Sequence, residues 1–150
     1  MTRSQEHPCL VVRVGAQLCA LPLQHVAETF RPQPARPVAG APPFVSGVAL
    51  IRGQAVPVVA AGDLLGVPSS PPTRFVSLRV DDRLVALAVD RVVGVRSLPD
   101  LARLPPLLTG AAREAVSAVA TLDSELLVVL DAARLVPPDV WASPGIGGAS

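Results

Sequence analysis

One order of elements occurs twice in this sequence, and that repeat limits the folds the chain can adopt. In each half, two short apolar runs joined by a turn lead into a proline-interrupted crossover, a second pair of apolar runs and a single helical turn. Aligning the halves brings Leu18 onto Leu84 in the first pair of runs and Gly53 onto Ser124 in the second. The offset changes inside the crossovers, where insertions cost least. Many short strands with regular turns favour two small β-barrels of about five strands each over one open sheet.

Each half, at roughly 60 residues, would be only marginally stable alone. We therefore expect the two lobes to share an apolar contact surface. Three proline-rich segments, at 32–43, 68–73 and 99–110, are expected to be crossovers or connectors. The expected strands and helical turns follow in chain order. They are strands at 9–14, 18–23, 25–31, 45–51, 55–61, 75–80, 84–89 continuing through 95, 116–122 and 125–130, and helical turns at 63–66 and 131–135.

The stretch from Val45 to Gly66 carries the most specific local signal. Gly53 permits the positive φ that a tight hairpin turn needs, so Arg52 and Gly53 are predicted to join two apolar strands. Arg52 is the only charged residue between Arg36 and Asp63. A lone charge at the tip of an apolar hairpin is a poor catalyst and a good contact for a partner protein.

Composition excludes several classes of protein. The net charge is +1, charged residues make up 17%, and the thirteen basic residues are all arginine, which together argue against a nucleic-acid binder. No apolar run approaches the roughly 18 residues of a membrane span. The N-terminal residues contain no apolar signal-peptide core, so we expect a cytoplasmic protein.

Few residues could perform chemistry. His25 could act as a base for Cys9 or Cys19, but no orienting carboxylate lies at a defined spacing from it. Both cysteines are expected to be buried free thiols, because the chain shows no sign of secretion. The two cysteines and two histidines have no metal-binding spacing, and no glycine-rich loop has a phosphate-binding pattern. We therefore expect no enzymatic activity, no metal and no cofactor.

What remains is the surface. Small barrels have open strand edges that can bind other chains. Val26, Glu28 and Arg52 are candidate contacts on such a surface. Spacing alone also allows Glu28 and Arg52 to be an ordinary solvated ion pair worth about 1 kcal/mol or less.

The run from Cys9 to Leu135 resembles the CheW family, the coupling proteins of bacterial chemotaxis arrays. The residues that carry this resemblance lie in both halves of the chain. In the first half they are VAETFR at 26–31, similar to V-x-E-I-x-R; AGAPPFVSGV at 39–48 with IRG at 51–53, similar to P-G-A-P-x-x-x-x-G-V-x-N-L-R-G; and VPVV at 56–59, similar to the start of V-x-P-V-x-D-L. In the second half they are D-x-V-x-x-V at 90–95 and LVVLD at 127–131.

The resemblance implies an all-β fold of two SH3-like five-stranded β-barrel lobes with short helical turns. A single CheW-like domain would span 9–142, with one lobe at about 9–67 and the other at about 74–142, and strand exchange between the lobes is left open. Residues 1–8 and 143–150 are expected to be disordered.

The resemblance also implies a function. Similar proteins are non-enzymatic adaptors that bridge the cytoplasmic tip of a methyl-accepting chemoreceptor to the regulatory domain of a CheA-type histidine kinase, at receptor arrays on the inner face of the membrane. Carried over by motif, the partner-binding residues would be Val26, Glu28, Gly47, Arg52 and Gly53.

Three positions depart from the family pattern. Leu50 stands where the family has Asn, Ala60 where it has Asp, and Ser46 where a basic residue is common. A diverged module that binds only one partner, as a decoy or array modifier, is therefore an alternative.

A small-molecule carrier that uses the inter-lobe groove is a further alternative, and a Cys/His hydrolase is a third. The adaptor requires an open groove at the lobe junction, whereas the carrier requires an enclosed cavity. The hydrolase requires His25 within hydrogen-bond reach of a thiol.

Overall fold

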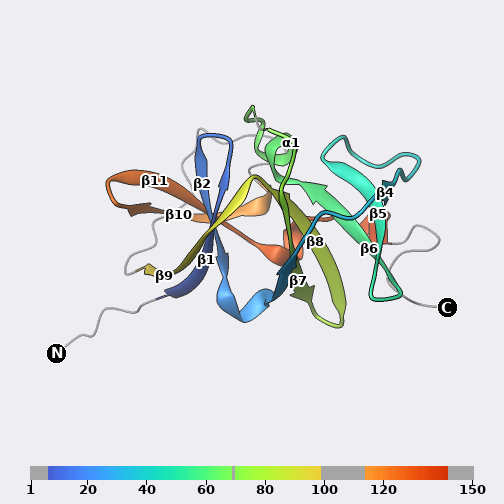
Figure 1. Cartoon of the computed structure of the whole chain (residues 1–150), viewed down its shortest axis with the longest axis horizontal. Coiled ribbons are helices and arrows are strands. Elements are labelled where there is room, and N and C mark those ends of the chain that lie inside the picture. Colours follow the sequence, from blue (N-terminus) through green and yellow to red (C-terminus); the bar gives the residue numbers. More distant parts are fainter. Residues whose placement is uncertain (1–6, 69, 99–113, 142–150) are drawn as a thin grey trace.

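The computed structural model describes residues 7–68, 70–98 and 114–141 (Figure 1). Nearly all of its regular structure is β-strand, so the all-β prediction is confirmed. The strands are β1 (His7–Val14), β2 (Gln17–Pro22), β3 (Val26–Phe30), β4 (Ala35–Arg36), β5 (Val45–Ile51), β6 (Gln54–Ala60), β7 (Arg74–Val80), β8 (Arg83–Val89), β9 (Arg91–Leu98), β10 (Val116–Leu122) and β11 (Glu125–Leu130). The short helical elements are η1 (Leu23–His25), α1 (Ala61–Leu65), η2 (Ala132–Arg134) and α3 (Pro138–Trp141).

Local signals account for both expected helical turns. α1 ends at Leu65 and is capped by Gly66, which has the left-handed φ of 69° typical of the residue after a helix. η2 begins after Asp131, whose carboxylate accepts a hydrogen bond from the Ala133 N–H at 3.0 Å. Within the described parts of the chain, no helix is both long and apolar enough to cross a membrane.

Some boundaries differ from those expected. β1 begins at His7, inside the segment 1–8 expected to be disordered, because His7 pairs with Leu98 on β9. The expected crossover at 32–43 contains the two-residue strand β4, which pairs with β5, and α3 had no expected counterpart. The expected crossover at 99–110 and tail at 143–150 lie outside the described residues.

The strands form two lobes, at the left and right of Figure 1. The terminal lobe, built from both ends of the chain, is a five-stranded sheet with the order β10-β11-β2-β1-β9. The central lobe is a six-stranded sheet with the order β3-β7-β8-β6-β5-β4. The sheets therefore do not follow the expected ranges 9–67 and 74–142, because each half of the sequence contributes its first hairpin to the other half's lobe.

The strand registers repeat between the lobes. The parallel pair of Val58 with Ala86 in the central lobe corresponds to Val129 with Ala20 in the terminal lobe. A β-bulge lies between Val26 and Glu28 in β3, and another lies at the corresponding place between Val92 and Gly94 in β9. Apart from β4, the strands of the central lobe thus have counterparts in the terminal lobe, residue by residue where the registers match.

Buried apolar side chains form three clusters. The terminal lobe has its own cluster around Val11 and Leu127, and the central lobe has one around Val56 and Ala86. The largest cluster joins residues of both lobes, so the expected shared apolar surface is confirmed. Alternation along β1 explains how, since Val11 faces the terminal lobe's cluster and Val12 faces the shared one. Each fully buried Val or Leu stabilises the fold by about 1.5–3 kcal/mol.

Candidate functional site

Glu28 and Arg52 form an ion pair on the surface of the central lobe. A guanidinium nitrogen of Arg52 donates to a carboxylate oxygen of Glu28 at 2.7 Å. The Arg52 side chain is 79% exposed and that of Glu28 is 35% exposed. The structure therefore brings together the two charged residues among the five that the sequence singled out.

A bulge and a buried hydroxyl position Glu28. The pairs Val26–Leu78 and Glu28–Ser77 leave Ala27 as an extra residue in β3, and a bulge of this kind re-aims the neighbouring side chains. The Ser77 hydroxyl accepts from the Glu28 N–H at 3.2 Å and donates to the Glu28 carbonyl at 3.3 Å. Ser77 is 1% exposed, so the backbone at Glu28 is fixed from inside the lobe.

A strained turn positions Arg52. Arg52 and Gly53 have φ of 52° and 78°, the two positive values of a type I′ hairpin turn. Asn or Gly is the usual residue at the first of these positions, and a left-handed conformation costs an arginine about 1–2 kcal/mol. Because an exposed ion pair returns about 1 kcal/mol or less, Arg52 is poorly explained by stability alone.

The other three expected contact residues are placed differently. Val26 is half-buried and packs against the shared core. Gly47 is buried in β5, where its φ of 145° and the nearby carbonyl of Arg36 on β4 leave no room for a side chain. Gly53 forms the turn and has nothing near its Cα that would obstruct a Cβ.

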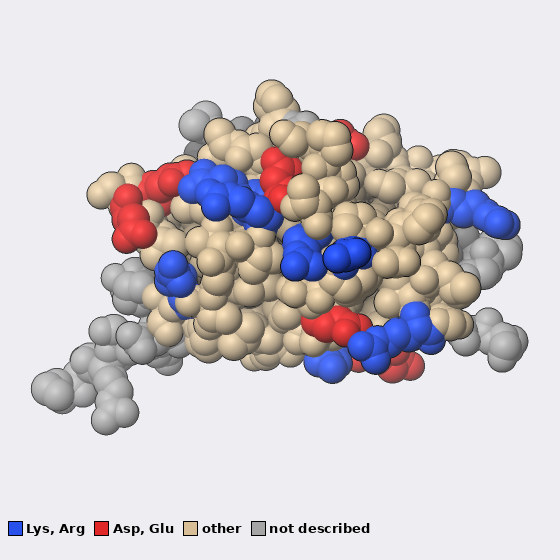
Figure 2. Space-filling model, in the orientation of Figure 1, with Lys and Arg blue, Asp and Glu red and all other residues tan. Residues whose placement is uncertain are grey.

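A polar hollow of about 530 Å³ lies beside the ion pair. It is lined by Ala27, Glu28, Arg52, Gln54, Ser77, Arg79, Asp81, Asp82, Arg83 and Leu84. Acidic and basic groups are interspersed there, as they are over the face shown in Figure 2, where no continuous basic surface appears.

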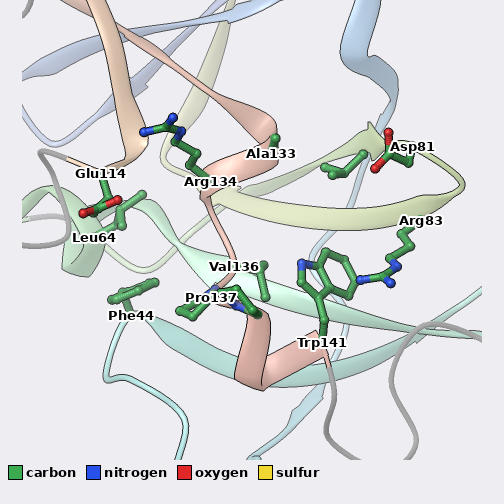
Figure 3. A pocket seen from close by; sticks show the side chains of 12 residues that line it. Phe44, Leu64, Asp81, Arg83, Glu114, Ala133, Arg134, Val136, Pro137 and Trp141 are labelled. Atoms are coloured by element: carbon green, nitrogen blue, oxygen red, sulfur yellow. The ribbon is translucent and has the colours of Figure 1, made fainter.

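A second, more apolar cleft of about 740 Å³ lies where the chain after β11 crosses from the terminal to the central lobe. Phe44, Leu64, Val136 and Trp141 are among its walls (Figure 3). The guanidinium carbon of Arg83 lies 4.9 Å from the centre of the Trp141 ring, a cation–π contact that ties α3 to β8. This cleft is partly open to solvent.

The structure offers no support for nucleophilic catalysis by the cysteines. Cys9 and Cys19 are free and buried, as expected. Burial raises the pKa of both thiols, that of Cys19 to about 12, which disfavours the thiolate needed for attack. His25 lies within hydrogen-bond distance of the Gln24 amide at 3.3 Å. Among the described residues, no three His, Cys, Asp or Glu side chains are grouped to hold a metal ion.

Several residues of this surface were not anticipated. Ser77 carried a readable signal, since it is the polar residue in the middle of the apolar run FVSL at 75–78. No sequence signal pointed to Gln54 or Arg79, because strand exchange brings them together. Nor did any signal point to Trp141, because its position depends on how the C-terminal segment packs.

Comparison with known proteins agrees with this architecture. A protein-family model described as the CheW-like domain matches residues 8–138. A chemotaxis protein CheW of Treponema pallidum (strain Nichols) is 23% identical over 140 residues, covering 87% of this chain and 82% of its own. A chemotaxis protein CheW of Rhizobium meliloti (strain 1021) is 27% identical over 135 residues, covering 87% of each chain.

A solved structure has the same fold. The crystal structure of the scaffolding protein TtCheW from Thermoanaerobacter tengcongensis superposes with a TM-score of 0.72 at 19% identity, covering 85% of this chain and 90% of that one. The family model covers nearly all of the two-lobed structure. The chain belongs to the CheW-like domain family.

Proposed function

We propose that this protein is a chemosensory adaptor that couples the cytoplasmic tip of a methyl-accepting chemoreceptor to the regulatory domain of a CheA-type histidine kinase. Membership of the CheW-like family and similarity to two chemotaxis CheW proteins support this proposal. The protein would act in the cytoplasm, at receptor arrays on the inner face of the membrane.

The observation that carries the proposal is the Glu28–Arg52 pair. Both side chains are solvent-accessible. Arg52 adopts a left-handed backbone conformation that costs stability, and the backbone of Glu28 is held by the buried Ser77 hydroxyl. Charges held in this way orient a partner and set the association rate more than they supply affinity. Apolar surface would supply the affinity, as in other complexes where a helix lies in a groove.

The mechanism requires no chemistry of the adaptor itself. The protein would bring two partners together by binding both, so that the geometry of its surfaces sets their relative position. The raised pKa of the two buried thiols is consistent with a non-catalytic role.

Isothermal titration of the full chain with a regulatory domain and with a receptor-tip fragment tests the proposal. We expect the parent protein to bind both, and Glu28→Ala and Arg52→Ala each to weaken at least one complex by about tenfold. Glu125→Gln is the matched control, because it breaks an ion pair of the same kind in the terminal lobe. A parent protein that binds neither partner would refute the proposal. Binding that both substitutions leave unchanged would refute the residue assignment and keep the adaptor.

A second candidate, an adaptor-like module that binds only one partner, is favoured by Leu50. This residue stands where the family motif has Asn and is 70% exposed, at a hollow lined by residues of β4 and β5 together with Pro34 and Pro37. Separate titrations distinguish the candidates, since this module would bind one partner only and Leu50→Asn would restore the second. A small-molecule carrier is less well supported, because it needs an enclosed cavity and the cleft beside Trp141 is partly open.

A further inference from the structure

The repeat between the lobes can be used to compare the same position in two settings. In the terminal lobe, Arg13 on β1 and Glu125 on β11 form a bidentate ion pair, with distances of 3.0 and 3.1 Å between their two nitrogens and two oxygens. Both side chains are partly buried. This pair joins the first hairpin of one half of the sequence to the second hairpin of the other half.

The counterparts in the central lobe are Arg79 and Gln54, by the same alignment that matches the strand registers. The guanidinium is therefore retained and its carboxylate is replaced by an amide. Arg79 is exposed, and within the described parts of the chain its side chain has no hydrogen bond or ion pair. Gln54 cannot neutralise it, although the amide NH₂ of Gln54 can donate hydrogen bonds.

Arg79 and Gln54 line the same polar hollow of about 530 Å³. The other two basic residues there are already engaged, since Arg52 pairs with Glu28 and Arg83 lies over the Trp141 ring. The hollow thus has space where the terminal lobe has a carboxylate, beside a guanidinium that pairs with no carboxylate in the described parts of the chain.

We propose that this hollow receives an acidic side chain of a protein partner, bound by the Arg79 guanidinium and by the Gln54 amide. The partner's carboxylate would take the place that Glu125 occupies in the terminal lobe. Charge-assisted hydrogen bonds of this kind are about twice as strong as neutral ones and are specific in geometry. This inference rests on the proposed function, because the partner meant is the kinase regulatory domain or the receptor tip.

The hairpin turn limits what the partner can present. Asp81 and Asp82 line the hollow at the turn between β7 and β8, where the terminal lobe has Gly15 and Ala16. The Asp81 and Asp82 carboxylates would repel any further acidic side chain that the partner placed close to this turn. We therefore expect a single Asp or Glu, flanked on the turn side by a neutral or basic residue, and not a polyacidic segment.

Gln54→Glu tests the site within the chain itself. The new carboxylate would pair with Arg79 as Glu125 pairs with Arg13, closing the hollow. We expect the thermal midpoint to rise by about 1–3 °C at low salt and the gain to disappear at high salt. We also expect the Arg79 Nε–Hε resonance to shift in the NMR spectrum. A variant with neither the salt-dependent gain nor the shift would overturn the proposal, because the site would then not accept a carboxylate.

The same variant tests the partner. Titrations with a regulatory domain and a receptor-tip fragment should show that Gln54→Glu and Arg79→Gln each weaken one complex by about tenfold. Arg74→Gln is the matched control, since Arg74 is an exposed arginine at the other end of β7 and outside the hollow. If the parent protein binds and both variants bind equally well, this inference is overturned and the proposed function stands. A parent protein that binds neither fragment overturns the proposed function and this inference with it.

Discussion

Arg52, at the turn between β5 and β6, donates to Glu28 on β3 over 2.7 Å, although β7 and β8 separate β3 from β6 in the order of the sheet. The two residues are 24 positions apart in the sequence. The sheet of the central lobe therefore curves until its β3 edge faces that turn. The counterparts in the terminal lobe are Gly94 and Asp123, which cannot form this pair because Gly94 has no side chain. The surface that carries the proposed function is thus specific to one lobe.

Removing this ion pair should affect binding far more than stability. We expect Arg52→Ala and Glu28→Ala each to lower the free energy of unfolding by about 1 kcal/mol or less, because Arg52 is highly exposed and solvent screens the pair. Urea unfolding of both variants and of the double variant measures the coupling between them. A loss of more than about 3 kcal/mol would show that the pair holds the lobe together, and weaker partner binding would then reflect unfolding.

Gly47→Ala should be much more damaging than Gly53→Ala. A Cβ at Gly47 would collide with the Arg36 carbonyl, and a φ of 145° is strained for any other residue, so we expect a loss of about 3 kcal/mol or more. Gly53 also has a positive φ, but its Cβ would meet no atom, so the cost should be about 1 kcal/mol. Urea unfolding compares the two variants. Equal losses would mean that β4 is free to move away from β5.

Ser77→Ala should disturb the position of Glu28. Its buried hydroxyl makes two hydrogen bonds to the Glu28 backbone, and losing them should cost about 1–3 kcal/mol. Ser117→Ala is the control, since the Ser117 hydroxyl donates to Val129 from an exposed residue and should matter little. Hydrogen exchange at the Glu28 amide is the direct measurement, because it should become faster only in the Ser77 variant. Unchanged exchange would show that the bulge alone fixes Glu28.

The sequence predicted local features well because local residues determine them. Arg52-Gly53 specified a two-residue turn, and the helical turns expected at 63–66 and 131–135 form as α1 and η2, with Gly66 and Asp131 at their ends. Each of these depends on the φ preference or hydrogen-bonding capacity of residues within one turn. The two-lobed fold followed from the repeat and the family motifs.

The partners of each strand could not be predicted in the same way. Alternation along β1 tells which face is buried, but Val11 and Val12 are both apolar and fit either of two cores. The hydrophobic pattern therefore could not predict that β2 pairs with β11, which lies in the other half of the sequence. That Arg79 has no ion pair among the described residues could not be recognised for the same reason, since its counterpart Arg13, and the Glu125 carboxylate that Arg13 binds, are identified only by the exchanged registers.

The Arg13–Glu125 pair should make stability depend on pH in an acid window. The hydrogen bond from Arg13 lowers the pKa of Glu125 below its ordinary value of 4.5. A carboxyl with a lower pKa in the folded state stabilises the protein above the unfolded-state pKa, and this contribution is lost as the pH falls through the folded-state pKa. The parent protein should therefore be more stable than Glu125→Gln at neutral pH, and the difference should shrink below about pH 4.5.

Urea unfolding of the two proteins from neutral pH down to about pH 3 measures this difference. Arg13→Gln should be less stable than the parent at neutral pH by a margin that also shrinks in acid, because it breaks the same pair from the other side. A difference that persists unchanged in acid would mean that Glu125 acts through packing and not through its charge.

The two cysteines should be inert in the folded protein. Cys19 is fully buried in the shared core with a pKa raised to about 12, and Cys9 is buried in the terminal lobe's own cluster with a raised pKa. A thiol reagent reacts with the exposed thiolate, so native-state labelling at about pH 8 should proceed only through opening of the structure. In urea, two thiols should react rapidly per chain, without added reductant. Rapid labelling of one thiol in the folded protein would show that a core opens locally, and no labelling in urea would show that the thiols are oxidised to a disulfide.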